Sequence, residues 1–171
     1  MVSNPKGMAN NLLKKGHTLH VYNRTKSVAL EFKEAAAEAG FDSVTVKDTP
    51  AEVVEASTVT YGMLADPVAA EAVVFGAGGV LETMGDGKAY VDCSTVDAAC
   101  SKKIGDAVQE KGGRFLEAPV SGSKKPAADA QLIFLCAGSQ SLYDEVLADQ
   151  LVPVMGKMSK YLGENVGQGA R

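Results

Sequence analysis

The hydrophobic positions of this chain follow two spacings that alternate along its length. Apolar residues three or four positions apart predict helices at residues 6–15, 28–39, 50–56, 67–75, 96–111 and 140–154, with one helical turn at 80–84. Short apolar segments between them predict strands at residues 19–22, 43–46, 58–64, 89–92, 114–117, 132–137 and 160–162. This alternation is typical of an α/β fold, here a doubly wound, mostly parallel sheet with helices on both faces.

Several predicted helices begin with residues that satisfy free backbone amides. Thr49 and Asp66 each precede a proline, so we expect both side chains to cap the helices that follow. Ser94 or Thr95 is predicted to cap the next long helix, and Ser139 is predicted to open the last one.

Composition and charge exclude several classes of function. The 171 residues are 46% hydrophobic and 22% charged, which is typical of a chain that buries a core. The net charge of −4 argues against a general nucleic-acid binder, and the longest apolar runs are strand-sized, so we expect no membrane span. The three cysteines are widely spaced and fit neither a disulfide framework nor a zinc site. We expect no metal site at His17 and His20 either.

Ligands of open α/β sheets bind at the carboxyl ends of strands, so the loops there carry the candidate chemistry. The loop after the predicted strand 19–22 is Asn23-Arg24-Thr25 and contains no acid. At this place in a dinucleotide-binding fold, an acid bonds the ribose 2′-hydroxyl of NAD, whereas an arginine neutralises the 2′-phosphate of NADP. Arg24 therefore favours NADP, and an ordinary solvated turn arginine is the alternative.

Residues 118–130 show neither spacing and are predicted to form a long loop with a second candidate site. Ser121 offers a donor and an acceptor, and Gly122 lets a ligand approach the backbone closely. Lys124 and Lys125 add positive charge. Such a loop suits a small carboxylate or aldehyde, and a surface loop with solvated lysines is the alternative.

Four motifs follow one another along the chain. They are residues 7–17 with 21–25, residues 63–67, residues 92–97, and residues 117–127 with the sequence EAPVSGSKKPA. Together they resemble the β-hydroxyacid dehydrogenase family, which includes 3-hydroxyisobutyrate dehydrogenases and has a cofactor domain similar to that of 6-phosphogluconate dehydrogenase. The basic Ser-Lys-Lys-Pro form of the last motif resembles the glyoxylate/succinic semialdehyde reductase branch.

The resemblance implies a Rossmann-like fold and an NADPH-dependent oxidoreductase. Its substrate would be a small aldehyde acid, glyoxylate or succinic semialdehyde, which is reduced to the hydroxy acid. The resemblance implies that NADP (NADPH) is held by residues of three loops, namely Asn23, Arg24, Thr25, Met63, Leu64, Ala65 and Thr95. It implies that the substrate is held by Ser121, Gly122 and Ser123.

The sequence departs from the family pattern at both ends. The family begins with a strand and a Gly-x-Gly-x-x-Gly turn that approaches the pyrophosphate, and that turn would fall here on residues 1–5, MVSNP. The family's proton-donating lysine lies on an interdomain helix beyond Arg171, so we assign no catalytic residue. We therefore expect residues 1–171 to be one incomplete NAD(P)-binding domain, without its first strand and without the helical second domain.

A missing first strand would leave backbone groups of its neighbours unpaired. We therefore expect either a homo-oligomer, as in the full-length family, or a partner that covers the open sheet. Two alternatives to a reductase stay open: a non-catalytic structural or interaction module in a larger assembly, and an NADPH-binding sensor without chemistry. Residues 1–7 hold no signal-peptide core, so we expect a cytoplasmic location, or an organellar one if an N-terminal segment is missing.

Overall fold

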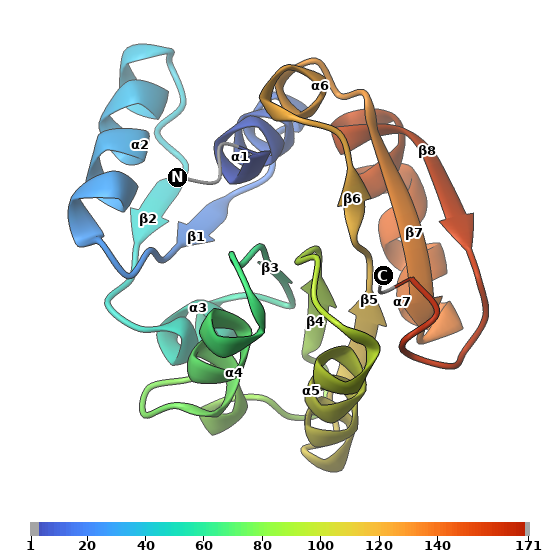
Figure 1. The fold of residues 1–171 in the computed structure, drawn as a ribbon. Helices are drawn as coiled ribbons and strands as arrows, with labels where there is room; N and C mark the ends of the chain where they lie inside the picture. The colour runs from blue at the N-terminus through green and yellow to red at the C-terminus, as the bar shows by residue number, and fades with distance from the viewer. Residues whose placement is uncertain (1–3, 170–171) are drawn as a thin grey trace.

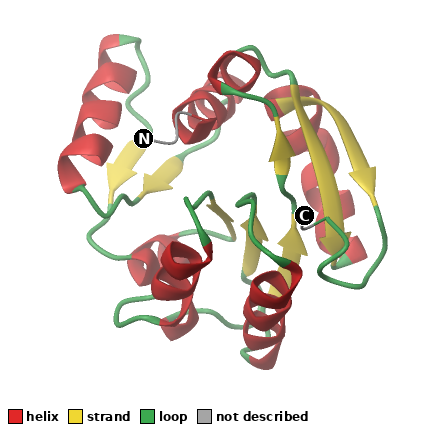
Figure 2. Ribbon diagram, in the orientation of Figure 1, coloured by secondary structure: helices red, strands yellow, loops and turns green. Residues whose placement is uncertain are grey.

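A computed structural model describes residues 4–169 and shows helices packed around two separate β-sheets (Figures 1 and 2). Residues 170–171 lie outside the described residues. So do residues 1–3, which belong to the range 1–5 where the family has its phosphate-binding turn and this sequence departs from it. The helices are α1 (Asn4–Lys15), α2 (Lys26–Glu38), α3 (Pro50–Ala56), α4 (Pro67–Phe75), α5 (Ala98–Glu110), α6 (Lys124–Ala128), α7 (Gln140–Val146), the 3₁₀ turn η1 (Val80–Glu82) and the π-helical η2 (Leu147–Met155). The strands are β1 (Leu19–Val21), β2 (Val44–Val46), β3 (Val59–Gly62), β4 (Ala89–Asp92), β5 (Arg114–Glu117), β6 (Val120–Ser121), β7 (Leu132–Gly138) and β8 (Gly156–Tyr161).

The predicted α/β fold with a mostly parallel sheet is confirmed, but its strands are divided between two sheets. β1 and β2 form a parallel pair. The larger sheet has the order β3-β4-β5-β7-β6, and β8 pairs with β7. Within it β3, β4 and β5 are parallel, β7 runs antiparallel to β5 and β6, and β8 is parallel to β7. Among residues 4–169, β1 pairs only with β2 and β3 pairs only with β4, so each has an edge without a strand partner.

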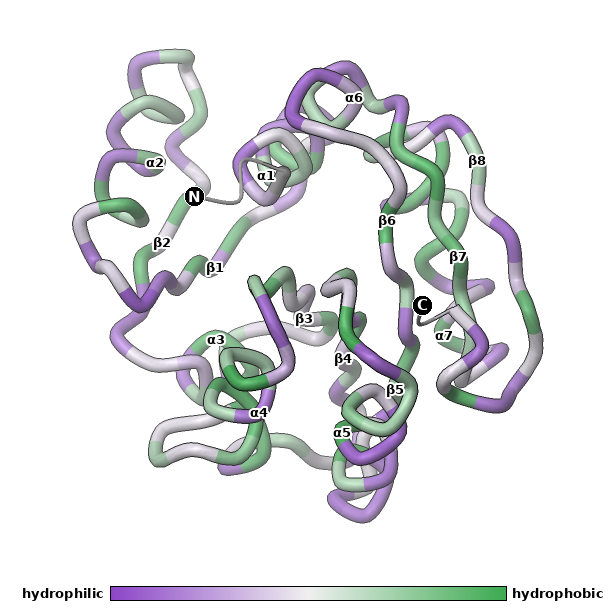
Figure 3. The backbone as a smooth tube through the Cα atoms, in the orientation of Figure 1, coloured by the Kyte–Doolittle hydropathy of each residue, from purple (hydrophilic) through white to green (hydrophobic). Residues whose placement is uncertain are grey.

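Two apolar clusters cover the two faces of the larger sheet because neighbouring side chains of a strand point to opposite faces. Val91 belongs to the cluster formed with α1, α7 and η2, whereas Tyr90 belongs to the cluster formed with α3, α4 and α5. The hydrophobic stretch of β7 stands out in Figure 3, and Phe134 in this strand is fully buried. The larger sheet, packed on both faces, is therefore the base from which the loops after β3, β4 and β6 extend.

Most helix starts follow the sequence prediction, but α5 does not. Thr49 and Asp66 cap α3 and α4 by accepting backbone amides at 3.2 and 2.8 Å, and Ser139 caps α7. The helix α5 is capped by Asp97, whose carboxylate accepts the amide of Cys100 at 2.9 Å. The expectation that Ser94 or Thr95 caps this helix was wrong, because the chain stays extended for two further residues before α5 begins.

The predicted loop 118–130 also contains regular structure, namely the two-residue strand β6 and the short helix α6. Both are too short to carry a periodic hydrophobic signal. The predicted last helix is interrupted, since Val152 and Pro153 have non-helical backbone angles. The last strand then begins at Gly156, four residues earlier than predicted.

Candidate functional site

Two of the predicted cofactor loops meet at the carboxyl ends of β3 and β4. The backbone amide of Leu64 donates a hydrogen bond to Ser94 Oγ at 2.9 Å. Because β3 and β4 are parallel and end in register, the loops that follow them leave the sheet at the same edge. These loops carry four of the predicted cofactor residues. Met63 and Leu64 are half-buried, whereas Ala65 and Thr95 are exposed.

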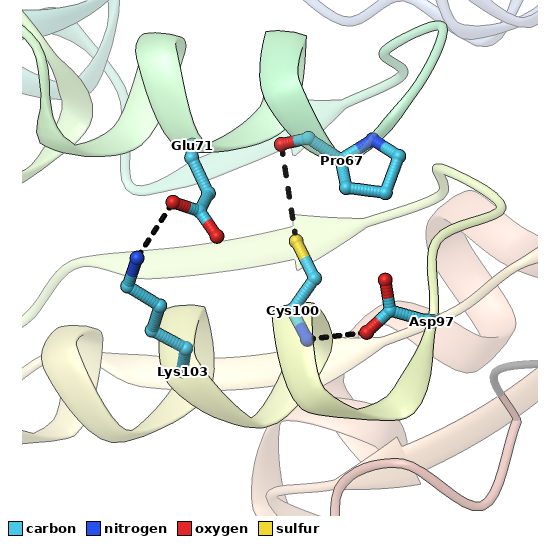
Figure 4. Close-up of polar contacts among 5 residues, drawn as sticks. All are labelled: Pro67, Glu71, Asp97, Cys100 and Lys103. Atoms are coloured by element: carbon cyan, nitrogen blue, oxygen red, sulfur yellow. Dashed lines mark hydrogen bonds and ion pairs between the residues drawn. The ribbon is translucent and has the colours of Figure 1, made fainter.

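The two loops lead into α4 and α5, which polar contacts hold together (Figure 4). Lys103 Nζ lies 2.6 Å from a carboxylate oxygen of Glu71, and Cys100 Sγ lies 4.0 Å from the carbonyl of Pro67. The ion pair is largely exposed, so it contributes little free energy. The starts of α4 and α5 are thereby kept side by side below the cofactor loops.

The predicted substrate residues lie at the junction of β6 and α6 and are exposed: Ser121 is the last residue of β6, Gly122 follows it, and Ser123 directly precedes α6. Gly122 has a φ of +141°, and a Cβ there would lie 2.8 Å from Leu132 Cδ2. The backbone of this loop therefore requires glycine at position 122. The helix α6 that follows is fixed on α1 by a 2.9 Å hydrogen bond from Asn11 Nδ2 to the carbonyl of Ala127.

The charges beside this loop are positive and solvent-exposed. Lys125 forms a 2.6 Å ion pair with Asp129, and this hydrogen bond raises the pKa of the lysine. Lys124 forms no ion pair with any residue of the range 4–169. Its ammonium group is therefore available to an anion at the substrate loop.

The third predicted cofactor loop, Asn23-Arg24-Thr25, follows β1 in the smaller sheet. Asn23 Oδ1 accepts the backbone amide of Thr25 at 2.9 Å, and Arg24 is exposed and has no ion-pair partner within the described part of the chain. No hydrogen bond between described residues joins this loop to the larger sheet. The structure thus brings together the loops after β3 and β4 and leaves the Arg24 loop on a separate sheet.

Two buried carboxylates lie at the ends of neighbouring strands, and the sequence analysis did not assign them to the site. Asp92 and Glu117 are the last residues of β4 and β5, face each other in register and are each 2% exposed. Burial raises the pKa of Asp92, the Glu117 charge raises it further, and hydrogen bonds from Ser94 oppose the shift. The available signal was that each acid directly follows two hydrophobic residues at the end of a predicted strand and precedes small residues.

The described residues hold no group of three or more His, Cys, Asp or Glu side chains arranged for a metal ion. None of the helices in residues 4–169 combines the length and apolar character that crossing a membrane requires.

Comparison with known proteins gives matches over nearly the whole chain. A family model described as the NAD binding domain of 6-phosphogluconate dehydrogenase matches residues 6–167. Glyoxylate/succinic semialdehyde reductase 1 of Arabidopsis thaliana is 50% identical over 166 residues, which are 97% of this chain and 54% of the reductase. The cytokine-like nuclear factor N-PAC of Homo sapiens is 42% identical over 165 residues, covering 96% of this chain and 28% of that protein.

Among solved structures, an imine reductase from Myxococcus stipitatus in complex with NADP⁺ has a TM-score of 0.79 at 21% identity. The match covers 96% of this chain and 53% of the imine reductase, and at this identity it concerns the fold alone. The chain therefore spans about half the length of both reductases.

Proposed function

The chain belongs to the family of the NAD binding domain of 6-phosphogluconate dehydrogenase, and on that premise we propose that it is the cofactor-binding part of an NADPH-dependent reductase. The proposed substrate is a small aldehyde acid, glyoxylate or succinic semialdehyde, which is reduced to the hydroxy acid. The similarity to the Arabidopsis reductase supports this substrate class. The structural observation that carries the proposal is the pair of hydrogen-bonded loops at the carboxyl ends of β3 and β4.

The residues present fit a nicotinamide dinucleotide phosphate. Arg24 offers a planar guanidinium without a competing acid, and Thr25 adds a hydroxyl beside it, which suits a 2′-phosphate. Met63 and Leu64 offer half-buried apolar surface against which the cofactor can lie. When bound, NADPH supplies the hydride. This chain's own residues bind and orient it at the edge of the sheet.

The loop after β6 is the proposed place of the substrate. The hydroxyls of Ser121 and Ser123 can donate hydrogen bonds to a carboxylate or carbonyl oxygen, and Gly122 keeps the backbone open to it. Lys124 adds an unpaired positive charge that attracts a small anion. These features favour a reductase of aldehyde acids over a sensor that binds only the cofactor.

A strand that pairs with β1 and β3 is the proposed partner of the open edges, supplied by a segment outside residues 4–169 or by a second subunit. His20 Nδ1 in β1 and Thr60 Oγ1 in β3 are buried without a hydrogen-bond partner in the described structure, so polar groups near both edges are unsatisfied. Each such buried group costs roughly 1–3 kcal/mol. In the natural protein we expect the backbone amides of β1 and β3 to exchange with deuterium as slowly as those of β4.

The reductase proposal is tested by mixing the natural full-length protein with NADPH and either glyoxylate or succinic semialdehyde. Oxidation of NADPH that depends on the acid supports it. Ser121→Ala should raise KM for the acid about tenfold, because a hydrogen-bond donor to a charged group is lost. The matched control Ser141→Ala, an exposed serine in α7, should leave KM unchanged. A folded protein that binds NADPH but oxidises it with neither acid would favour the sensor instead.

A further inference from the structure

The buried carboxylate of Glu117 joins segments that lie far apart in the sequence. Its Oε2 accepts hydrogen bonds from Ser101 Oγ at 2.6 Å and from the backbone amide of Gly167 at 2.8 Å. Its Oε1 accepts the backbone amide of Gly169. No Lys, Arg or His within residues 4–169 forms an ion pair with it. The charge is therefore balanced by one hydroxyl and two backbone amides.

Both amides belong to a segment that we call the C-terminal strap, residues 163–169. The strap has no helix or strand, and its end lies beside β5 and β6 in Figure 1. It is fixed at its start by a 3.0 Å hydrogen bond from the amide of Gly138 to the carbonyl of Gly163, and in its middle by Val166, which packs against the apolar cluster next to α5. At its far end, Glu117 is the acceptor for both strap amides.

The strap ends against the start of the candidate substrate loop. Gly169 is buried, and a Cβ at this position would lie 2.7 Å from the carbonyl oxygen of Leu135 and 3.2 Å from Pro119 Cγ. Pro119 comes two residues before Ser121, and its carbonyl accepts the amide of Leu135 at 3.1 Å. The strap, β7 and the first residues of the substrate loop are thus in mutual contact at the end of β5.

We propose that Glu117 is a positioning residue that holds the strap 163–169 against Pro119 and thereby fixes the start of the Ser121–Ser123 loop. An ionised carboxylate in this buried place is tolerated only while its donors surround it. Conversely, if the Glu117 carboxylate is removed, the backbone amides of Gly167 and Gly169 lose their hydrogen-bond acceptor. The order of the strap and the burial of the charge therefore depend on each other.

Residue-resolved hydrogen–deuterium exchange on the natural full-length protein tests the proposal. In the wild type we expect the amides of Gly167 and Gly169 to exchange as slowly as that of Phe115 in β5. Glu117→Gln keeps the side-chain volume but replaces one acceptor oxygen by a donor group, so exchange in the strap should become about tenfold faster or more. Exchange in β4 should be unchanged.

Two control variants separate the strap from general effects on the fold. Ser101→Ala removes one donor from the same carboxylate but leaves both strap bonds, so strap exchange should become faster by a clearly smaller factor than in Glu117→Gln. Glu145→Gln makes the same chemical change at an exposed carboxylate in α7 and should have no effect on the strap. If Glu117→Gln does not fold, the exchange rates of the Gly167 and Gly169 amides in the wild type, compared with that of Phe115, decide whether the proposal stands.

Rapid exchange of Gly167 and Gly169 in the wild type would overturn the proposal. Unchanged exchange of the strap amides in Glu117→Gln would also overturn it. Exchange that becomes faster by the same factor in the strap and in β4 would overturn it as well, because Glu117 would then only support the sheet.

A kinetic measurement, which rests on the proposed reductase function, extends the test. Glu117→Gln should raise KM for the aldehyde acid about threefold or more and should change the Kd for NADPH by a smaller factor, because the end of the strap packs on Pro119 at the start of the substrate loop. A wild type that reduces neither acid contradicts the proposed function but leaves the exchange result on the strap intact. An active wild type whose Glu117→Gln variant shows an unchanged KM contradicts the role of Glu117 in fixing the substrate loop.

Discussion

The side-chain carbonyl of Asn23 accepts the backbone amide of Thr25 at 2.9 Å, which closes the turn after β1 around Arg24. Such a turn fixes the backbone without using the guanidinium, which stays exposed and unpaired among the described residues. A guanidinium that extends from a fixed turn and has no ion-pair partner among the described residues is suited to a phosphate. This relationship makes Arg24 the residue on which cofactor selectivity is expected to depend.

Arg24→Ala should therefore weaken the binding of NADPH about tenfold or more, because a charge-assisted contact with the 2′-phosphate is lost. The affinity for NADH, which has no such phosphate, should change less than about twofold. Calorimetric titration of the natural full-length protein with both cofactors measures the two affinities. Lys33→Ala, which removes an exposed charge from α2, is the matched control and should leave both affinities unchanged. An equal loss for NADPH and NADH would mean that Arg24 does not recognise the phosphate.

Much of the fold could be predicted from the sequence, because many strands and helix caps depend on only a few neighbouring residues. The strand at Ala89–Asp92 is apolar and bounded by polar turns, and the caps Thr49 and Asp66 each bond an amide three residues later. Strand and cap are both decided within a few residues, so a single sequence is sufficient to predict them. The carboxyl edge with its loops follows once the strands are known to be parallel.

Other features depend on contacts between distant parts of the chain and could not be predicted. β6 is a strand only because Val120 and Ser121 pair with β7. The burial of Glu117 depends on Gly167 and Gly169, which lie about 50 positions further along the chain. No local pattern carries this information, because a glutamate at the end of a strand is equally compatible with exposure to solvent.

Tyr90 carries a buried hydroxyl that finds no hydrogen-bond partner among the described residues, and the residue is 1% exposed. Tyr90→Phe keeps the ring, which lies 6.2 Å from the Phe115 ring between centroids, and removes the unsatisfied hydroxyl. We expect the free energy of unfolding to rise by about 1 kcal/mol. In the control Tyr143→Phe it should fall by a similar amount, because the Tyr143 hydroxyl accepts a hydrogen bond from Ser159 at 3.1 Å. Urea titration measures both free energies of unfolding. A free energy of unfolding that falls in Tyr90→Phe would show that the Tyr90 hydroxyl has a hydrogen-bond partner in solution.

The cysteines Cys93, Cys100 and Cys136 are buried and unpaired, and burial raises the pKa of each thiol. The pKa of Cys136 is raised to about 11, so at about pH 8 only about one molecule in a thousand carries its reactive thiolate. We expect iodoacetamide to leave all three thiols unmodified in the folded protein and to modify all three in urea. Mass spectrometry counts the added groups. Rapid modification of Cys136 in the folded protein would contradict its burial in β7.

Asp92 is expected to make the stability of the protein depend on pH. Burial, reinforced by the Glu117 charge, raises the pKa of Asp92 above its ordinary value of 3.8. The folded state then holds the proton more tightly than the unfolded state. The resulting stabilisation is fully present below the unfolded-state pKa and is lost as the pH rises through the folded-state pKa. We therefore expect the wild type to lose stability relative to Asp92→Asn as the pH rises from about 4 to about 7.

Urea unfolding of the two proteins at a series of pH values measures this difference. Asparagine keeps the oxygen that accepts the Ser94 amide at 2.9 Å, so the comparison isolates the second carboxylate oxygen, which is buried and has no partner among the described residues. The stability of Asp92→Asn minus that of the wild type should increase with pH. A difference that stays constant, or that decreases as the pH rises, would show that solvent or a bound group stabilises the ionised carboxylate, and that the end of β4 is less isolated from water than its burial indicates.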